Sequence, residues 1–180
     1  MRRQFQSERL ILRELEASDC SADYVGWLAD PEINRFLETR FSPQNEASVI
    51  AFIEGVRSRS DEFLFGMFLR EGGRHIGNIK VGPIKPHHRL ADVSLLVGAR
   101  DCWGRGYAAE AIAAVSRYAF EELGVLKLSA SMYAPNRGSE QAFLKVGYKD
   151  EGLRRQHYEL DGDRCDLIEL GLLPSDLEPR

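Results

Sequence analysis

The stretch that decides the fold is residues 93–111, VSLLVGARDCWGRGYAAEA. Its first part, Val93 to Val97, is apolar enough to predict a buried strand, and the alanine-rich part after Gly106 predicts a helix. The loop between them contains Gly104 and Gly106, which allow backbone angles and close approaches that a side chain would block. A helix after such a loop directs unpaired backbone N–H groups and the positive end of its dipole at one point. The stretch therefore predicts an anion site for a phosphate or pyrophosphate.

Two familiar phosphate loops fit this stretch poorly. A Walker-type loop needs Lys and then Ser or Thr after its last glycine, whereas a tyrosine and an alanine follow here. A dinucleotide fingerprint of the form G-x-G-x-x-A does match Gly104, Gly106 and Ala109. That fingerprint should follow its strand almost directly and precede a strand that ends in an acid, and neither condition is met. A glycine turn that caps the helix and binds nothing stays open as the structural alternative.

A third kind of loop matches better. Residues 101–106, Asp-Cys-Trp-Gly-Arg-Gly, resemble the acetyl-CoA loop of the GNAT N-acetyltransferases, whose core pattern is Q/R-x-x-G-x-G/A. Asp101 stands in place of the usual Gln or Arg. Asn136-Arg137-Gly138-Ser139, followed by residues 143–148, resembles the family's second signature, an Asn after a strand and a helix that ends in Gly and an aromatic residue.

The start of the chain resembles one branch of this family. Residues 9–13, Arg-Leu-Ile-Leu-Arg, are similar to the opening strand of the branch that includes the ribosomal-protein N-terminal acetylases, and residues 30–36 also suit that branch. The matches run in order from residue 9 to about residue 172. The resemblance implies an α/β fold with a mixed, twisted, mostly antiparallel sheet of about seven strands flanked by helices. It also implies that this sheet is splayed between its fourth and fifth strands, with the acyl chain in the gap.

Composition limits the class of protein. A chain of 180 residues, 43% hydrophobic, predicts one domain spanning residues 1–180. A net charge of −4 argues against a general nucleic-acid partner. Three cysteines without a C-x-x-C pair and four histidines without ligand spacing predict no disulfide framework and no metal site. No apolar run approaches membrane-spanning length and no hydrophobic signal region opens the chain, so we expect a cytoplasmic protein, monomeric or homodimeric, without a membrane partner.

Periodicity and turn residues predict where the elements lie. We expect helices over about 20–37, broken near Asp30-Pro31, from Ser42 as N-cap to about Arg59, over 108–123 and over 139–146. Strands are expected near 10–12 and over 64–70, 75–81, 91–97, 127–133, 154–160 and 164–172, the last two turning at Asp161-Gly162. Glu110 on the outer face of the third helix is expected to be solvated.

The resemblance implies acetyl-CoA as co-substrate. Backbone N–H groups from Trp103 to Ala108 should hold its pyrophosphate, with charge-assisted contacts from Arg105 and Arg100. The free edge of the strand that ends at Val97 should pair with the pantetheine arm. Asn136 is expected either to bind this arm or to cap the following helix. The predicted cofactor-binding residues are Leu95, Leu96, Val97, Trp103, Gly104, Arg105, Gly106, Tyr107, Ala108, Asn136, Ser139 and Phe143.

The expected catalytic residues are Asp92 and Ser139. Asp92 resembles the position where several family members place a glutamate that takes the proton of the amine, and its alternative role is a surface pair with Arg89. His87 or His88 is a second candidate base. The family's tyrosine acid falls at a phenylalanine here, which cannot donate a proton. Ser139 lies near the expected thiol, and its alternative role is to bond backbone in the first helical turn.

These expectations combine into an acetyl-CoA-dependent N-acetyltransferase, an acyltransferase that moves an acetyl group to a primary amine by direct attack in a ternary complex. The acceptor is either a small amine or amino sugar, or a protein N-terminus. Candidate acceptor contacts are Glu38, Arg40, Asn78, Lys80, Tyr158 and Glu159. A non-catalytic acyl-CoA-binding sensor on the same scaffold is the alternative, supported mainly by Phe143.

Overall fold

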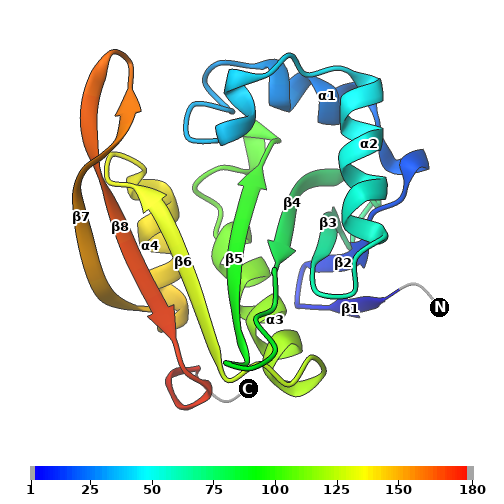
Figure 1. Ribbon diagram of the computed structural model, residues 1–180. Helices are drawn as coiled ribbons and strands as arrows, with labels where there is room; N and C mark the ends of the chain where they lie inside the picture. Colours follow the sequence, from blue (N-terminus) through cyan, green and yellow to red (C-terminus); the bar gives the residue numbers. More distant parts are fainter. Residues whose placement is uncertain (1–2, 178–180) are drawn as a thin grey trace.

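Eight strands form one sheet in the order β1-β2-β3-β4-β5-β6-β8-β7 within residues 3–177, the part of the chain that the computed structural model describes (Figure 1). Neighbouring strands are antiparallel except for β5 and β6, which are parallel. The strands are β1 (Gln4–Gln6), β2 (Leu10–Glu14), β3 (Phe63–Leu69), β4 (His75–Val81), β5 (Leu90–Val97), β6 (Lys127–Tyr133), β7 (Lys149–Leu160) and β8 (Asp163–Leu172). This confirms the expected mixed, mostly antiparallel sheet, with the short β1 as one strand more.

Helices cover both faces of the sheet, two on each (Figure 1). They are α1 (Ala22–Ala29), α2 (Glu46–Arg57), α3 (Tyr107–Glu121) and α4 (Arg137–Val146), with short 3-10 turns η1 (Ala17–Asp19), η2 (Glu38–Phe41), η3 (Arg100–Cys102) and η4 (Pro174–Asp176). Side chains of α1 and α2 form one buried cluster with Leu64 and Phe68 of β3. Side chains of α3 and α4 belong to the larger cluster on the opposite face.

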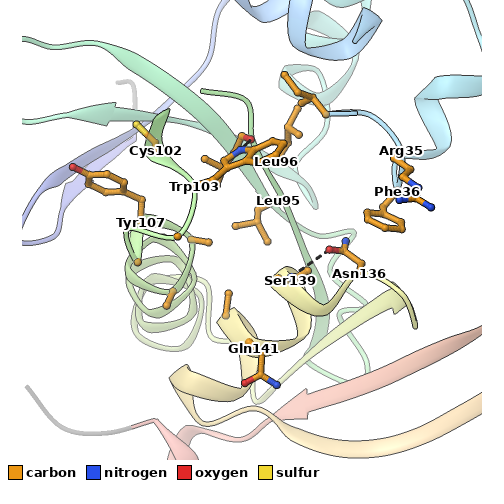
Figure 2. Close-up of a pocket in the computed structure, with 18 of the residues that line it drawn as sticks. Arg35, Phe36, Leu95, Leu96, Cys102, Trp103, Tyr107, Asn136, Ser139 and Gln141 are labelled. Carbon is orange, nitrogen blue, oxygen red and sulfur yellow. Dashed lines mark hydrogen bonds between the residues drawn. The ribbon is translucent and has the colours of Figure 1, made fainter. Parts of the chain in front are cut away.

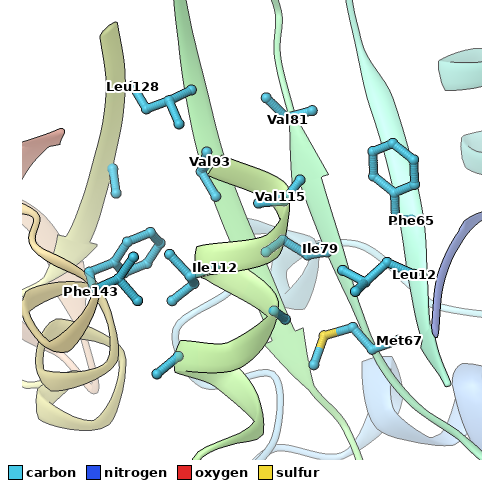
Figure 3. Close-up of a cluster of buried hydrophobic side chains, with 14 of the residues drawn as sticks. Leu12, Phe65, Met67, Ile79, Val81, Val93, Ile112, Val115, Leu128 and Phe143 are labelled. Carbon is cyan, nitrogen blue, oxygen red and sulfur yellow. The ribbon is translucent and has the colours of Figure 1, made fainter. Parts of the chain in front are cut away.

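The larger cluster fixes the position of α3. Ile112, Val115 and Ala119 recur at helical spacing, are fully buried and share this cluster with Ile79 of β4 and Val93 of β5 (Figure 3). Burial of one large aliphatic side chain contributes about 1.5–3 kcal/mol. Because several such side chains lie along one face of α3, the helix is held against β4 and β5, and the position of its N-terminus is fixed as well.

The sheet opens between β5 and β6. Their pairing covers only Leu90–Asp92 against Lys127–Ser129, and beyond it the two strands diverge (Figure 1). On the other side of β5, Gly98 donates its N–H to Ile76 on β4. By the alternation of an antiparallel ladder, Leu95 and Val97 therefore direct their backbone groups away from β4, into the opening. Because β1 was not among the seven expected strands, β5 and β6 are the fourth and fifth of them, and the splay expected between these two strands is confirmed. The opening leaves β5 with a free edge.

Two local expectations are wrong. The N-cap of α2 is Asn45 rather than Ser42, because the side-chain oxygen of Asn45 accepts the N–H of Ser48 and the N–H of Asn45 donates to the Ser48 hydroxyl, a reciprocal capping box. Glu110 is not a plain solvated residue, since its carboxylate accepts hydrogen bonds from the Ser7 hydroxyl and from the backbone and Nε of Arg9. Burial raises the pKa of Glu110, but these hydrogen bonds outweigh it and hold the pKa below its usual value.

Among residues 3–177 no helix combines the length and apolar character that a membrane crossing requires.

Candidate functional site

A cavity of about 580 Å³ lies at the opening between β5 and β6 (Figure 2). Four parts of the chain form its walls: the end of β5, the loop and first turn of α3, the first turns of α4, and the segment 32–37. Ten of the predicted cofactor-binding residues line it, namely Leu95, Leu96, Val97, Trp103, Gly104, Gly106, Tyr107, Ala108, Asn136 and Ser139. The residues that the sequence pattern grouped therefore line one cavity, although they lie on three separate elements.

The N-terminus of α3 supplies the anion-binding part of this cavity. Gly106 is the N-cap residue, with φ 82° and no side-chain cap. The N–H groups of the first helical residues, Tyr107, Ala108 and Ala109, have no carbonyl within the helix to bind. Gly104 also has a left-handed φ of 70°. This arrangement of unpaired donors at the positive end of a helix favours a phosphate group.

Arg9 adds positive charge beside this helix terminus, and the sequence pattern did not single it out. Its guanidinium lies 4.4 Å from the ring centroid of Tyr107 and donates to the backbone oxygen of Arg105 at 3.0 Å. Its Nη2 would be 3.5 Å from a Cβ placed on Gly106. The ion pair with Glu110 holds Arg9 in this position. This contact joins the turn between β1 and β2 to the loop and first turn of α3 across about a hundred residues, so it leaves no local pattern to detect.

Trp103 lies across the free edge of β5. Its indole N–H donates to the backbone oxygen of Val97 at 2.7 Å, and both residues line the cavity. Figure 2 shows the ring beside Leu96 and above Leu95. The side chain thus satisfies one of the edge groups that the opening of the sheet leaves without a strand partner.

Asn136 and Ser139 meet at the start of α4 on the opposite wall. The Asn136 side-chain oxygen accepts the Ser139 N–H at 3.3 Å, which makes Asn136 the N-cap of α4 (Figure 2). The capping role expected as one alternative is therefore present, and Asn136 still lines the cavity. Ser139, which carries a hydroxyl, also lines the cavity.

Three predicted site residues do not line the cavity among the described residues 3–177. Phe143 is buried in the core, edge-on to Tyr148, so it is not the cofactor contact that was expected. Arg105 is exposed, with its guanidinium 5.6 Å from the ring centroid of Tyr107. Asp92 is exposed at the end of β5 that pairs with β6, and its backbone oxygen accepts the N–H of Gly82.

Two arginines have partners other than those expected. Arg89, the partner of Asp92 in that residue's alternative role, donates its Nε to the backbone oxygen of Gly124 at 2.7 Å. Arg100, expected at the cofactor, instead pairs with Asp30 at 2.7 Å and with Glu32 at 2.9 Å. Arg100 therefore ties the loop before α3 to the segment that forms another wall of the cavity.

Four of the candidate acceptor residues gather around Tyr133, at the end of β6. The Tyr133 hydroxyl donates to the Glu38 carboxylate and accepts from Arg40 at 2.9 Å. Burial and the hydrogen bond to Glu38 raise the pKa of Tyr133 to about 12, so the phenol is protonated at neutral pH. Tyr158 stacks on Tyr133 at 4.7 Å between ring centroids, and the backbone oxygen of Glu159 accepts from Arg40 at 3.1 Å.

The other two candidate acceptor residues lie elsewhere, on β4. The Asn78 side-chain oxygen is 2.8 Å from Nε2 of His75, and its amide nitrogen is buried without a partner among the described residues. Lys80 forms an ion pair with Glu62. Neither residue lines the cavity. Within residues 3–177, no three His, Cys, Asp or Glu side chains converge in a way that could hold a metal ion.

Sequence comparison places the chain in a family. The family model described as "Acetyltransferase (GNAT) domain" matches residues 9–149, so the chain belongs to the GNAT acetyltransferase family. It is 28% identical over 163 residues to the uncharacterized N-acetyltransferase YoaA of Bacillus subtilis, which covers 89% of this chain and 91% of that protein. It is 26% identical over 169 residues to the uncharacterized N-acetyltransferase p20 of Bacillus licheniformis, covering 93% and 94%. These homologues support an acyltransferase.

Solved structures have the same fold. RimJ of Mycobacterium smegmatis, in complex with CoA-disulfide, superposes with a TM-score of 0.82 at 18% identity and covers 99% of this chain and 89% of that chain. RimL, a ribosomal L7/L12 alpha-N-protein acetyltransferase in complex with coenzyme A, gives 0.83 at 15% identity, covering 95% and 98%. Spermidine N-acetyltransferase of Vibrio cholerae, in complex with CoA and spermine, gives 0.82 at 20% identity, covering 93% and 97%. The fold expected from the resemblance is thereby confirmed.

Proposed function

We propose that this protein is an acetyl-CoA-dependent N-acetyltransferase that moves an acetyl group to a primary amine by direct attack. The observation that carries the proposal is the uncapped N-terminus of α3, which opens into the cavity beside the free edge of β5. An anion site next to an unpaired strand edge suits a ligand with a pyrophosphate followed by an amide-rich arm. Family members in complex with coenzyme A support this assignment.

In this proposal the chain binds and orients its two substrates. The first N–H groups of α3, with the guanidinium of Arg9 beside them, hold the pyrophosphate. The backbone groups of Leu95 and the N–H of Val97 pair with the pantetheine amides. The amine nitrogen attacks the thioester carbonyl, the C–S bond breaks, and the acetyl group ends on nitrogen. The amine loses one proton and the departing sulfur gains one. No covalent intermediate on the protein is required.

The two protons define the roles proposed for Asp92 and Ser139. Asp92 is exposed on β5, outside the cavity walls, so it would take the proton of the amine through water rather than by direct contact. Ser139 lines the cavity and has a hydroxyl that can donate to the sulfur. The residue at the family's tyrosine position, Phe143, is buried and cannot take this role.

Ligand-induced stabilisation and thiol release together test the proposal. Acetyl-CoA at one hundred times its Kd should stabilise the fold by about 2.7 kcal/mol, whereas NADH and ATP at equal concentration should do much less. Thiol release from acetyl-CoA should depend on an added amine. If NADH stabilises the protein as much as acetyl-CoA does, the glycine loop is better interpreted as a dinucleotide-binding loop than as an acetyl-CoA loop.

A non-catalytic acyl-CoA sensor is the second candidate, favoured by the burial of Phe143 where the family's acid stands. It predicts stabilisation by acetyl-CoA without amine-dependent thiol release across a broad panel of amines. Asp92→Asn separates the two further. If Asp92 is the base, turnover should fall about 10²–10⁴-fold with acetyl-CoA affinity unchanged, and the loss should shrink as pH rises and more amine is neutral. Superimposable pH–rate profiles would remove Asp92 from the mechanism.

A further inference from the structure

One end of the cavity has an apolar lining. In Figure 2, Ser139 lies between Tyr107, at the glycine-loop end, and Phe36, at the other end. Four apolar side chains of the segment 33–37 and of β5 form this lining, and we call them the apolar end: Ile33, Phe36, Leu37 and Leu96. All of them except Phe36 also pack against the buried cluster of α1 and α2. The apolar end is therefore backed by the core of the protein.

Hydrogen bonds within the segment 28–37 hold this lining in place. The Asn34 side chain is buried and donates to the backbone oxygen of Leu28 at 2.8 Å. Along the backbone, the N–H of Asn34 donates to the oxygen of Asp30 at 2.9 Å, and the N–H of Leu37 donates to the oxygen of Asn34 at 2.7 Å. These bonds fold the segment into successive turns whose apolar residues are already in position. A ligand that binds against them does not have to order this segment first.

The charged side chains of this segment lie at its surface. Glu32 and Arg35 line the cavity, and both are exposed. Glu32 shares Arg100 with Asp30, and Arg35 pairs with Asp161 at 2.6 Å. Neither Arg100 nor Asp161 lines the cavity. The charged groups are thus engaged outside the lining, and the apolar end offers a ligand hydrocarbon contacts.

The acyl chain is the part of the thioester that suits the apolar end. The proposed function places the sulfur near Ser139, and the acyl group continues from the sulfur, away from the pyrophosphate and the glycine loop. Figure 2 shows Phe36 next to Asn136, the N-cap of the helix that carries Ser139. A primary amine is a cation in water, and its desolvation against apolar side chains is costly. A hydrocarbon chain instead gains about fourfold in affinity for each CH2 that it buries, from about 0.8 kcal/mol.

We infer that the apolar end is an acyl pocket, and that the protein transfers a short aliphatic acyl group, propionyl or butyryl, in preference to acetyl. The inference rests on the proposed function, whose reaction is unchanged: the amine nitrogen bonds to the acyl carbon, the C–S bond breaks, and the proton of the amine ends on sulfur. The pocket is short because the Phe36 ring lies 6.0 Å from the ring of Tyr133, which is buried behind it.

Binding of a series of CoA thioesters tests the pocket without knowledge of the acceptor. Calorimetry should show propionyl-CoA binding about fourfold and butyryl-CoA about tenfold more tightly than acetyl-CoA, and octanoyl-CoA no more tightly than butyryl-CoA. Thiol release with a panel of glucosamine, spermidine and a tetrapeptide with a free N-terminus should give a higher kcat/KM for butyryl-CoA than for acetyl-CoA with whichever amine reacts.

Phe36→Ser removes the ring and adds a hydroxyl at the apolar end. The ratio of butyryl-CoA to acetyl-CoA affinity should fall at least threefold, with acetyl-CoA affinity nearly unchanged. Phe41→Ser is the matched control, because Phe41 is 67% exposed and does not line the cavity, and it should leave the ratio as it is. Ile33→Thr, a smaller change in the same lining, makes the same test if Phe36→Ser does not fold.

Equal affinity of the unchanged protein for acetyl-CoA, propionyl-CoA and butyryl-CoA would overturn the acyl pocket and leave the proposed function intact. Tighter binding of octanoyl-CoA than of butyryl-CoA would overturn the preference for short chains, and an unaltered ratio in both Phe36→Ser and Ile33→Thr would overturn the assignment of the lining. If no CoA thioester binds, or if all bind without thiol release to any amine, the proposed function itself is wrong, and the inference with it.

Discussion

Replacement of Gly106 by alanine tests the anion site at the start of α3. Gly106 has φ 82°, and an L-residue in the left-handed region costs about 1–2 kcal/mol. A Cβ there would meet only Arg9 Nη2, at 3.5 Å, which is ordinary contact, so no steric cost adds to this strain. A domain of this size loses about 2–4 °C of Tm per kcal/mol, and Gly106→Ala should therefore lower the Tm by about 2–8 °C.

The effect of Gly106→Ala on binding should exceed its effect on stability. A methyl group at the N-cap obstructs the approach of an anion to the first N–H groups of α3, and loss of one hydrogen bond to a charged group costs about 1.5–3 kcal/mol. Acetyl-CoA affinity, measured by calorimetry, should accordingly fall about 10- to 100-fold.

Gly72→Ala is the matched control for backbone strain. Gly72 has φ 76°, lies in the turn between β3 and β4, and a Cβ added to it would meet no heavy atom within 4 Å. This variant should lose similar stability and keep its affinity for acetyl-CoA. The assignment of the α3 N-terminus as the anion site is refuted if Gly106→Ala weakens acetyl-CoA binding no more than Gly72→Ala does.

Three further outcomes are expected. Acetyl-CoA should change the fluorescence of Trp103, which lines the cavity, so the change should persist in Trp27→Phe and vanish in Trp103→Phe. Burial lowers the pKa of His75 below its ordinary 6.5, so the folded state binds fewer protons than the unfolded chain and should lose stability as pH falls below about 6.5; His75→Gln should flatten this dependence in urea titrations from pH 7.5 to 5.5. Glu110→Gln should cost about 1–3 kcal/mol in urea unfolding, because Arg9 and its backbone N–H lose a charged acceptor.

Local patterns were enough to predict that the end of β5, the glycine loop and the start of α3 meet at one place. A strand, a glycine loop and a helix follow one another within residues 93–111, and sequence order alone brings their ends together. The family pattern Q/R-x-x-G-x-G/A, first matched to residues 101–106, also fits residues 103–108, with Trp103 in the Q/R position and Gly106 and Ala108 in the last two specified positions. The geometry favours this later register, because Gly106 rather than Gly104 directly precedes the first helical residue.

Contacts between distant segments could not be predicted in this way. Arg40 meets Tyr133 across more than ninety residues, and Arg35 meets Asp161 across more than a hundred and twenty. Sequence spacing carries no trace of such pairs. Even the local start of α2 was misplaced, because Ser42 and Asn45 are both good N-cap residues and only the reciprocal bond from Ser48 selects Asn45.

The acid at residue 101, where the family pattern was expected to have Gln or Arg, is compatible with an anion site in this structure. A free carboxylate beside a pyrophosphate would repel it. Asp101, however, accepts two hydrogen bonds from Arg74, at 2.7 and 2.8 Å, and Arg74 holds the pKa of Asp101 below its usual value. Arg74, in the turn between β3 and β4, thus neutralises the Asp101 carboxylate and holds it on that side of the loop. The N–H groups after Gly106, at the positive end of the α3 dipole, are left at the cavity and favour a phosphate there, while the charge of Arg9 is shared with Glu110.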